Sequence, residues 1–571
     1  MKHFFTVLIS LLYVSASLCT AFAQNKVTAN SGTEIPAKVS QWINRELAKA
    51  KRKTLMDFKA GEFFAKDTAR LIGYIKGYNP QAGFSTGMIY ARNEITNEDN
   101  PVVVQIHEDG SFEGAIPLNY PVYSQVLFND DWIDFYIQPG QTLAMFFNMD
   151  SLHKNVRYRG ATGNINNELF AFQTKLPDIP YEKIQDGRKD KTPEEFKPFL
   201  DSCLTDYAKT YQRLLGTEKL SKASKNILRN NYQIAYATYL FGYKKDYMMN
   251  NQMPLEFYNF LQNIPMNNKE LLSTQDFGTF INHLEFCQPL SISIRRITLK
   301  KSITSKSDDE IPKITEDKTD LLMQDTIILI FDPNKTKEKK YANVIKKFTP
   351  EEMAIEEWRL KDSVYTNVLK LKPGIVYDVI KIRSLDFLFG QRLENNKEAA
   401  WNVLTALTSD IPESLLRSEA DRIFLKNFPE DQRGVYELPD TYEAKIFKDL
   451  IAPFKGKILI VDFWATTCGP CVYAIKQDKT LREQYKDSPD IDFIFITSEE
   501  LSPLGAYNNF VKEQELTNTY RINADQYRYL RQLFRFNGIP RYVLVDKEGK
   551  ILDDNYDCSN LDTKLEELTK K

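Results

Sequence analysis

The sequence predicts a multidomain protein with an N-terminal antiparallel β-sandwich-like domain, a central all-α region and a C-terminal α/β domain. Three observations support this fold class. The chain has 571 residues, more than a single hydrophobic core usually organises. Hydrophobic residues make up 42% of it, so each domain can bury a core. The apolar pattern changes twice along the chain, and we expect domains over residues 24–163, 164–430 and 431–571, after a signal peptide over residues 1–23.

The first 23 residues are typical of a secretory signal peptide. A positively charged start precedes an apolar run over residues 4–18, and Ala-Phe-Ala follows at residues 21–23. The run is shorter than the ~20 apolar residues that a spanning helix needs. We expect export to the periplasm, cleavage after Ala23 and no stable membrane insertion. The alternative is a lipoprotein acylated at Cys19, which the bulky Leu18 disfavours.

Residues 69–158 alternate short runs of β-branched and aromatic residues with turn signals such as Asp109-Gly110. This spacing is typical of an antiparallel sandwich or a small barrel. A short amphipathic helix over residues 36–51 is expected to precede it. The expected strands are residues 71–75, 86–91, 102–107, 111–116, 122–128, 133–137 and 143–147.

From residue 164 the apolar spacing becomes helical. Two expected helix starts share one pattern, Thr192-Pro193 and Thr349-Pro350, each followed by two glutamates. The threonine can cap the helix, proline suits its first position, and the acids favour the positive end of the helix dipole. Residues 300–318 are polar and are expected to form an exposed loop.

Residues 431–571 alternate strand and helix patterns, which indicates a mostly parallel sheet. The expected strands are residues 458–464, 491–497 and 541–546, and the expected helices are residues 471–485, 504–513, 526–534 and 561–570.

The six cysteines do not form the dense framework of a small disulfide-stapled domain. Cys203 and Cys287 could form a disulfide or stay as two buried thiols, and both interpretations remain open. Cys558 is expected to be a spectator, with a second resolving role as the alternative. Only Cys468 and Cys471 are closely spaced.

A buried strand leads into Cys468-Gly469-Pro470-Cys471, which opens a helix. Free backbone N–H groups and the dipole at a helix N-terminus stabilise a thiolate over a thiol, and they lower the thiol pKa from about 8.5 to roughly 3.5–7.5. We therefore predict that Cys468 is the nucleophile. Cys471 lies one turn later, where it can resolve a mixed disulfide held on Cys468.

The segment from Asp462 to Cys471 resembles the active-site region of thioredoxin, including its Asp-Phe-Trp-Ala lead-in. The resemblance implies a thioredoxin fold for the C-terminal domain. It also implies that Asp462 is a buried acid that exchanges protons with Cys471, a role suited to a carboxyl group in an apolar strand, where the pKa is raised. An unpaired surface aspartate is the alternative. By the same resemblance, Trp464, Gly469 and Pro470 contact the substrate.

A second thioredoxin-like signature is Asn537-Gly538-Ile539-Pro540, followed by an apolar strand. It resembles the loop in which a cis-proline, here Pro540, faces the cysteine pair while the backbone of Ile539 pairs with the substrate. Gly538 permits the turn, and a cis bond is plausible only before proline. Gly-Ile-Pro alone is an ordinary turn, but after the cysteine motif it becomes specific.

Two departures from thioredoxin leave the substrate preference open. Thr467 stands where thioredoxin has a tryptophan, and residues 491–497 contain no lysine to pair with the buried acid. Residues 499–534 form an insertion expected to hold an extra helix and strand. With the export signal, this insertion resembles the TlpA/ResA branch of bacterial envelope oxidoreductases. The β-then-helical order ahead of it loosely resembles large TlpA-like envelope proteins.

Other chemistries fit the cysteine pair poorly. A structural zinc site needs four ligands, yet no second CxxC is present and the four histidines are scattered, so no metal is expected. A peroxiredoxin-type peroxidase would need threonine and proline where Ala465 and Val461 stand. A structural disulfide would not explain the position at a helix start together with the paired proline loop.

These features predict an exported thiol–disulfide oxidoreductase that reduces disulfide-containing envelope proteins and is itself reduced by a membrane electron donor. The Gly-Pro dipeptide resembles that of reducing thioredoxins, whose potential is about −270 mV. No cofactor is expected. Lysine plus arginine (75) nearly cancels aspartate plus glutamate (77), which argues against nucleic acid as a partner. The alternative function is an envelope binding or scaffolding protein with an accessory redox domain.

Overall fold

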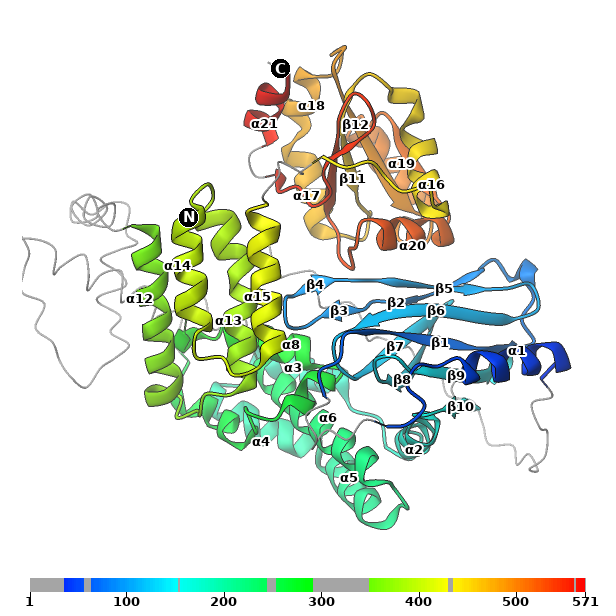
Figure 1. The fold of residues 1–571 in the computed structure, drawn as a ribbon, viewed down its shortest axis with the longest axis vertical. Coiled ribbons are helices and arrows are strands. Elements are labelled where there is room, and N and C mark those ends of the chain that lie inside the picture. The colour runs from blue at the N-terminus through cyan, green and yellow to red at the C-terminus, as the bar shows by residue number, and fades with distance from the viewer. Residues whose placement is uncertain are drawn as a thin grey trace, which may run out of the picture.

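The structure, a computed structural model, describes residues 35–55, 63–151, 155–243, 253–290, 349–429, 435–558 and 561–569. It contains a sheet region (α1 and β1–β10), a helical region (α2–α15) and a C-terminal domain (α16–α21 and β11–β15), which confirms the expected multidomain order. In Figure 1 the C-terminal domain sits above the sheet region, and the helical region adjoins one end of it. The predicted signal peptide, Cys19 and the predicted loop at residues 300–318 lie outside the described residues. The domain boundaries stay predictions.

The sheet region confirms all seven expected strands and adds three. Its elements are α1 (Ala37–Ala48), β1 (Asp67–Lys76), β2 (Thr86–Ile89), β3 (Arg92–Asn93), β4 (Glu98–Asp99), β5 (Val102–Ile106), β6 (Ser111–Leu118), β7 (Val122–Phe128), β8 (Asp131–Ile137), β9 (Thr142–Asn148) and β10 (Arg157–Gly160). Strands β3 and β4 form a separate two-stranded sheet, and the others form one sheet of eight strands in the order β10-β9-β1-β6-β5-β2-β7-β8.

This eight-stranded sheet curls around a single core. Phe128 on β7 and Phe147 on β9 are separated in the sheet by four strands, yet their ring centroids lie 5.3 Å apart. The prediction of an antiparallel domain is wrong at one pair, because β1 and β9 run parallel. A parallel pair needs a long crossover, and here the intervening strands supply it. A sheet-rich N-terminal domain is confirmed, while the two-sheet detail of a sandwich stays a prediction.

The helical region contains both expected proline-started helices. Thr192 and Thr349 each form a capping box with the glutamate three residues later, Glu195 and Glu352, so each helix begins where the sequence predicts. The elements are α2 (Gly163–Gln173), α3 (Tyr181–Asp190), α4 (Pro193–Cys203), α5 (Thr205–Thr217), α6 (Lys222–Phe241), η4 (Leu255–Asn263), η5 (Lys269–Ser273), α8 (Phe277–Glu285), α12 (Pro350–Ser363), η6 (Val364–Val368), α13 (Ile375–Phe387), η7 (Leu388–Arg392), α14 (Lys397–Thr408) and α15 (Ser414–Asn427).

The C-terminal domain is a five-stranded sheet with helices on its faces, in the order β13-β12-β11-β14-β15. Its elements are α16 (Tyr442–Ile451), β11 (Ile458–Phe463), α17 (Gly469–Gln477), α18 (Lys479–Gln484), β12 (Ile491–Ser498), α19 (Leu504–Glu513), β13 (Thr519–Ile522), α20 (Ala524–Leu533), β14 (Arg541–Val545), β15 (Ile551–Asp553) and α21 (Leu561–Thr569). The expected insertion is present as α19 and β13.

Two details of the C-terminal domain differ from prediction. The sheet is mixed rather than mostly parallel, because β14 runs antiparallel to both β11 and β15. Strands β14 and β15 are joined by a short turn, which forces an antiparallel pair. The helix expected over residues 471–485 is interrupted at Asp478, which separates α17 from α18. None of the helices within the described ranges has the length and apolar character needed to cross a bilayer.

Candidate functional site

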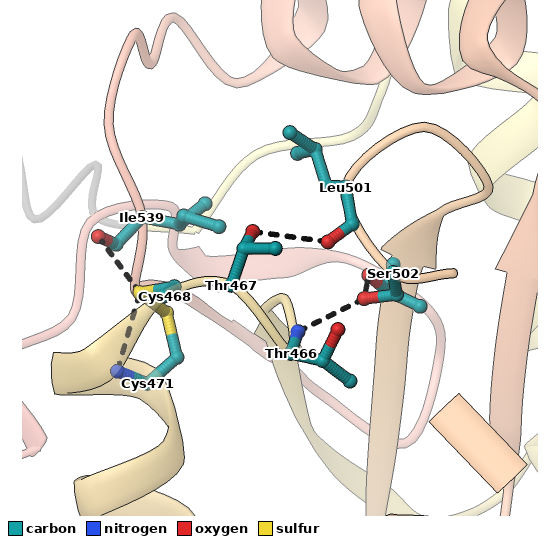
Figure 2. Close-up of a disulfide and its surroundings, with 8 residues drawn as sticks. Thr466, Thr467, Cys468, Cys471, Leu501, Ser502 and Ile539 are labelled. Atoms are coloured by element: carbon teal, nitrogen blue, oxygen red, sulfur yellow. Dashed lines mark hydrogen bonds between the residues drawn. A yellow bond between two sulfur atoms is a disulfide. The ribbon is translucent and has the colours of Figure 1, made fainter. Parts of the chain in front are cut away.

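Cys468 and Cys471 lie where β11 leads into α17, and they are joined by a disulfide with an S–S distance of 2.11 Å (Figure 2). Cys468 is the N-cap residue of α17, and its Sγ accepts a hydrogen bond from the backbone N–H of Cys471 at 3.2 Å. Cys468 is partly exposed, whereas Cys471 is fully buried at 0% exposure. Of the two sulfurs, only that of Cys468 is therefore accessible to another molecule.

The local sequence explains why this turn forms. Every residue of β11 is buried between β12 and β14, so the strand is held on both edges up to Phe463. Pro470 stands in the first turn of α17, where its missing N–H costs no helical hydrogen bond. The backbone N–H of Cys471 donates to the Cys468 sulfur, and together with the helix dipole it stabilises the thiolate once the disulfide is reduced.

The loop before Cys468 is tied to the loop between β12 and α19. The backbone N–H of Thr466 donates to Ser502 Oγ at 3.0 Å, and Thr467 Oγ1 donates to the carbonyl oxygen of Leu501 at 3.0 Å (Figure 2). Ser502 is itself buried and bonded to Thr497 at 2.8 Å. Thr467 thus anchors the position where thioredoxin has a tryptophan. Ser502 carries no signal in the sequence pattern, and sequence reasoning missed it.

The two sequence signatures, about 70 residues apart, meet in space. The peptide bond between Ile539 and Pro540 is cis, as expected, and the carbonyl oxygen of Ile539 lies 3.6 Å from Cys468 Sγ (Figure 2). Gly469 is exposed, and Pro470, Ile539 and Pro540 are partly exposed. These four residues therefore border the accessible sulfur, although their contact with a substrate stays a prediction.

Asp462 lies on β11 with only 5% of its surface exposed, which excludes the alternative of a surface aspartate. Burial raises the pKa of its carboxyl group well above the usual range, and the nearby negative charge of Asp478 raises it further. The Arg482 guanidinium acts in the opposite direction. Among the described residues, Asp462 Oδ1 has no hydrogen-bond partner. A buried carboxyl group with a raised pKa is suited to proton exchange.

Arg482 on α18 supplies the positive charge that β12 lacks, and sequence reasoning missed it. Its Nη1 donates to the carbonyl oxygen of Ile475 at 2.6 Å, and burial lowers its pKa. Asp478 and Arg482 stand four residues apart. This four-residue spacing of an acid and a base was the available signal.

Trp464 corrects a prediction. We expected it to contact the substrate, but it is fully buried and packs with Cys471, Ile475 and Phe495. The ring of Phe510 on α19 lies 5.2 Å from the tryptophan ring. Helix α19 of the insertion therefore covers Trp464, and Trp464 packs against the buried Cys471.

The other described cysteines differ from the pair. Cys203, Cys287 and Cys558 are free, so the open alternative of a disulfide between Cys203 and Cys287 is not realised. Burial raises the pKa of the Cys287 thiol to about 12. Burial also raises the pKa of Cys558, and the charge of Asp462 adds to this effect. Both thiols are therefore held in the unreactive protonated form.

The C-terminal domain has a cysteine pair at a helix start, opposite a cis-proline loop on a mixed five-stranded sheet. A comparison with known families agrees with this arrangement. Residues 427–568 match the Redoxin family. This part of the chain is a Redoxin domain. The resemblance of the Redoxin domain to thioredoxin-superfamily oxidoreductases of the TlpA/ResA kind is confirmed.

Two relatives match about a sixth of the chain. Thiol-disulfide oxidoreductase ResA of Bacillus thuringiensis subsp. konkukian is 28% identical over 101 residues, which are 18% of this chain and 56% of that protein. Protein SUPPRESSOR OF QUENCHING 1, chloroplastic, of Arabidopsis thaliana is 28% identical over 101 residues, 17% of this chain and 9% of that protein. The chain thus spans about half the length of the ResA relative that it matches.

Among solved structures, the thioredoxin domain of a thiol-disulfide oxidoreductase from Bacteroides vulgatus is 22% identical, with a TM-score of 0.19. The match covers 20% of this chain and 82% of that chain. A thiol-disulfide oxidoreductase from Bacteroides fragilis is 23% identical, with a TM-score of 0.18, and the match covers 20% of this chain and 83% of that chain.

A polar cleft of about 2070 Å³ adjoins the Redoxin domain. Residues of all three parts of the molecule line it, including Arg92 of the sheet region, Arg383 of the helical region and Arg541 of the Redoxin domain. Arg541 directly follows Pro540 in the sequence, whereas residues 537–540 do not line the cleft. Neither cysteine of the pair lines it.

Proposed function

We propose that this protein is an exported thiol–disulfide oxidoreductase that reduces disulfides of proteins outside the cytoplasm. Its general class rests on the Redoxin domain and on the similarity to ResA. One observation carries the proposal. The partly exposed Cys468 sulfur lies at a helix N-terminus, 3.6 Å from the Ile539 carbonyl oxygen, and is bonded to a fully buried Cys471.

The reaction starts from the dithiol form. The Cys468 thiolate attacks one sulfur of the substrate disulfide, which breaks that bond, forms a mixed disulfide and releases the other substrate sulfur as a thiolate. The Cys471 thiolate then attacks the Cys468 sulfur. This second step forms the Cys468–Cys471 disulfide and releases the remaining substrate sulfur. The substrate gains two electrons, and a membrane electron donor restores the dithiol by the reverse exchange.

Asp462 manages the proton of the second step. Cys471 is fully buried, so water has poor access to its thiol. The ionised Asp462 carboxylate accepts the thiol proton as the thiolate forms and later returns it, and its raised pKa makes it a stronger base than an ordinary carboxylate. The backbone of Ile539 and the ring of Pro540 position the substrate segment beside Cys468, and Gly469 and Pro470 border it on the other side.

The direction of electron flow follows from the redox potential. We expect a value near that of reducing thioredoxins, about −270 mV, measured by equilibration with glutathione buffers. A value near about −120 mV, as in a strongly oxidising enzyme, would contradict the reductase assignment.

Trapping tests the proposal directly. A Cys471→Ser variant cannot resolve the mixed disulfide, so protein substrates should accumulate on Cys468 and be released by reductant. The matched control is Cys468→Ser with Cys471→Ser, which should trap none. If Cys471→Ser traps no more protein than the control, the oxidoreductase function is wrong.

A further inference from the structure

Helix α20 of the Redoxin domain is hydrogen-bonded to the sheet region. Asp525 accepts hydrogen bonds from the backbone N–H of Ser85 at 2.8 Å and from the hydroxyl group of Thr86 at 2.5 Å. Gln532, two turns further along α20, accepts a bond from the backbone N–H of Val103 at 2.7 Å. These contacts fix the orientation of one domain on the other.

A second contact reaches the cis-proline loop itself. Asp99 on β4 accepts two hydrogen bonds from Asn537, one from the backbone N–H at 2.8 Å and one from the side-chain amide at 3.1 Å. The same amide group donates to the carbonyl oxygen of Ala91 at 2.9 Å. Asn537 stands two residues before Ile539, so the sheet region binds the first residue of the loop that faces Cys468.

Both sides of this contact are themselves fixed. Arg92 pairs with Asp99 across the β3–β4 sheet, and its Nε lies 2.8 Å from Asp99 Oδ1. On the other side, Arg531 is buried and donates to the carbonyl oxygen of Asn537 at 2.6 Å. Its guanidinium also lies 5.7 Å from the ring centroid of Tyr90 in the sheet region. Asn537 is therefore hydrogen-bonded through its backbone N–H, its backbone carbonyl oxygen and its side-chain amide group.

We infer that Asp99 is a positioning residue for disulfide exchange with protein substrates, because it fixes the start of the loop that pairs with the substrate backbone. Gly538, which follows Asn537, is exposed, and a Cβ added to it would meet no atom within 4 Å. No side chain therefore covers Gly538 on that side, and an unanchored glycine populates many conformations. This inference rests on the proposed function and adds the sheet region to its substrate site.

Glu98, the neighbour of Asp99, provides a matched control. Its carboxylate faces the helical region, where it pairs with Arg422 and lies 3.3 Å from Lys426 on α15. Substituting Glu98 therefore disturbs the same two-residue strand without touching Asn537. Successive side chains of a strand point to opposite sides, which explains why these two acids serve different neighbours.

The experiment uses the full chain in its reduced form and compares two disulfide probes. Insulin is a protein substrate whose backbone must pair with the loop, whereas 5,5′-dithiobis(2-nitrobenzoic acid) is a small disulfide that needs only the Cys468 thiolate. We expect Asp99→Ala to slow the reduction of insulin about tenfold, while the small probe reacts within about twofold of wild type. Glu98→Ala should stay within about twofold of wild type with both probes.

A more conservative variant guards against misfolding. Asp99→Asn keeps one acceptor oxygen for the Asn537 backbone, so its insulin rate should fall between those of wild type and Asp99→Ala. If Asp99→Ala and Asp99→Asn both reduce insulin at the wild-type rate, or if Asp99→Ala slows both probes equally, Asp99 does not position the loop. Failure of the wild-type protein to reduce insulin at all would instead reject the proposed function on which this inference rests.

Discussion

Asp134 on β8 and Asp462 on β11 are both enclosed carboxyl groups, but their surroundings differ. Asp134 Oδ1 accepts hydrogen bonds from the side-chain amides of Gln125 at 2.7 Å and Gln275 at 3.0 Å. Its other oxygen accepts a bond from the hydroxyl group of Tyr123 at 3.1 Å. Asp462 Oδ1, by contrast, has no hydrogen-bond partner among the described residues.

We interpret Asp134 as an acid that stabilises the fold and Asp462 as an acid that exchanges protons during the reaction. Burial raises the pKa of both groups, but hydrogen bonds oppose this effect at Asp134, and at Asp462 only the charge of Arg482 does. Because Gln275 belongs to the helical region, Asp134 also joins that region to the sheet region. We therefore expect substitutions around Asp462 to change reaction rates and substitution of Asp134 to change stability.

The largest effect is expected from the loss of the attacking cysteine, Cys468. Cys468→Ser replaces the attacking thiolate with an unreactive hydroxyl group, so the rate of insulin reduction should fall by about 1000-fold or more. Thermal unfolding should change little, because Cys468 is partly exposed. A variant that kept more than a tenth of the activity would place the nucleophile elsewhere.

The second-largest effect is expected from Asp462→Asn, because the amide group cannot accept the proton of Cys471. We expect release of substrate from the mixed disulfide to slow by about 100-fold, measured by stopped-flow after rapid mixing. The exposed Asp449 on α16 supplies a control, and Asp449→Asn should leave this step unchanged. Equal rates in wild type and Asp462→Asn would remove the acid from the mechanism.

The same variant tests the raised pKa through stability. A carboxyl group with a raised folded-state pKa keeps its proton when the unfolded chain has lost it, so its contribution to the free energy of unfolding falls as the pH rises above about 4. Asparagine has no such dependence. Asp462→Asn should therefore unfold at a higher temperature than wild type at about pH 8, and the difference should vanish near pH 4. A difference that is constant with pH would contradict this account.

Asp134→Ala should lower the stability of the protein without changing its reaction rate. It leaves two amide donors and a tyrosine hydroxyl group without their acceptor, and we expect the free energy of unfolding to fall by about 2 kcal/mol in urea titrations. The insulin rate at a temperature where the protein stays folded should be that of wild type. Asp130→Ala, in the exposed turn between β7 and β8, is the control and should cost less than about 0.5 kcal/mol.

The smallest effect is expected at Cys558. Its thiol is held protonated by burial and by nearby acids, so Cys558→Ala should keep the insulin rate within about twofold of wild type. A larger loss would revive the alternative that Cys558 is a second resolving thiol.

Much of the Redoxin domain could be predicted because its signals are local. The apolar run of β11, the Pro470 that suits a helix start and the Gly538 turn each act within a few residues. The capping boxes at Thr192 and Thr349 were predictable for the same reason. Ser502 and Arg482 were missed as site residues, and Asn537 was placed in the signature without a role, since each acts through a contact whose partner is distant in the sequence or in another element.

The sequence by itself predicted the chemistry: which cysteines react, which acid accompanies them and which proline faces them. These predictions rest on residue type, on spacing along the chain and on the resemblance to thioredoxin. Only the tertiary structure decided that Trp464 is buried rather than exposed, that Cys203 and Cys287 are free thiols, and that Asp99 of the sheet region contacts the cis-proline loop. Contacts between residues hundreds of positions apart follow from how separate regions pack, and no local pattern encodes that packing.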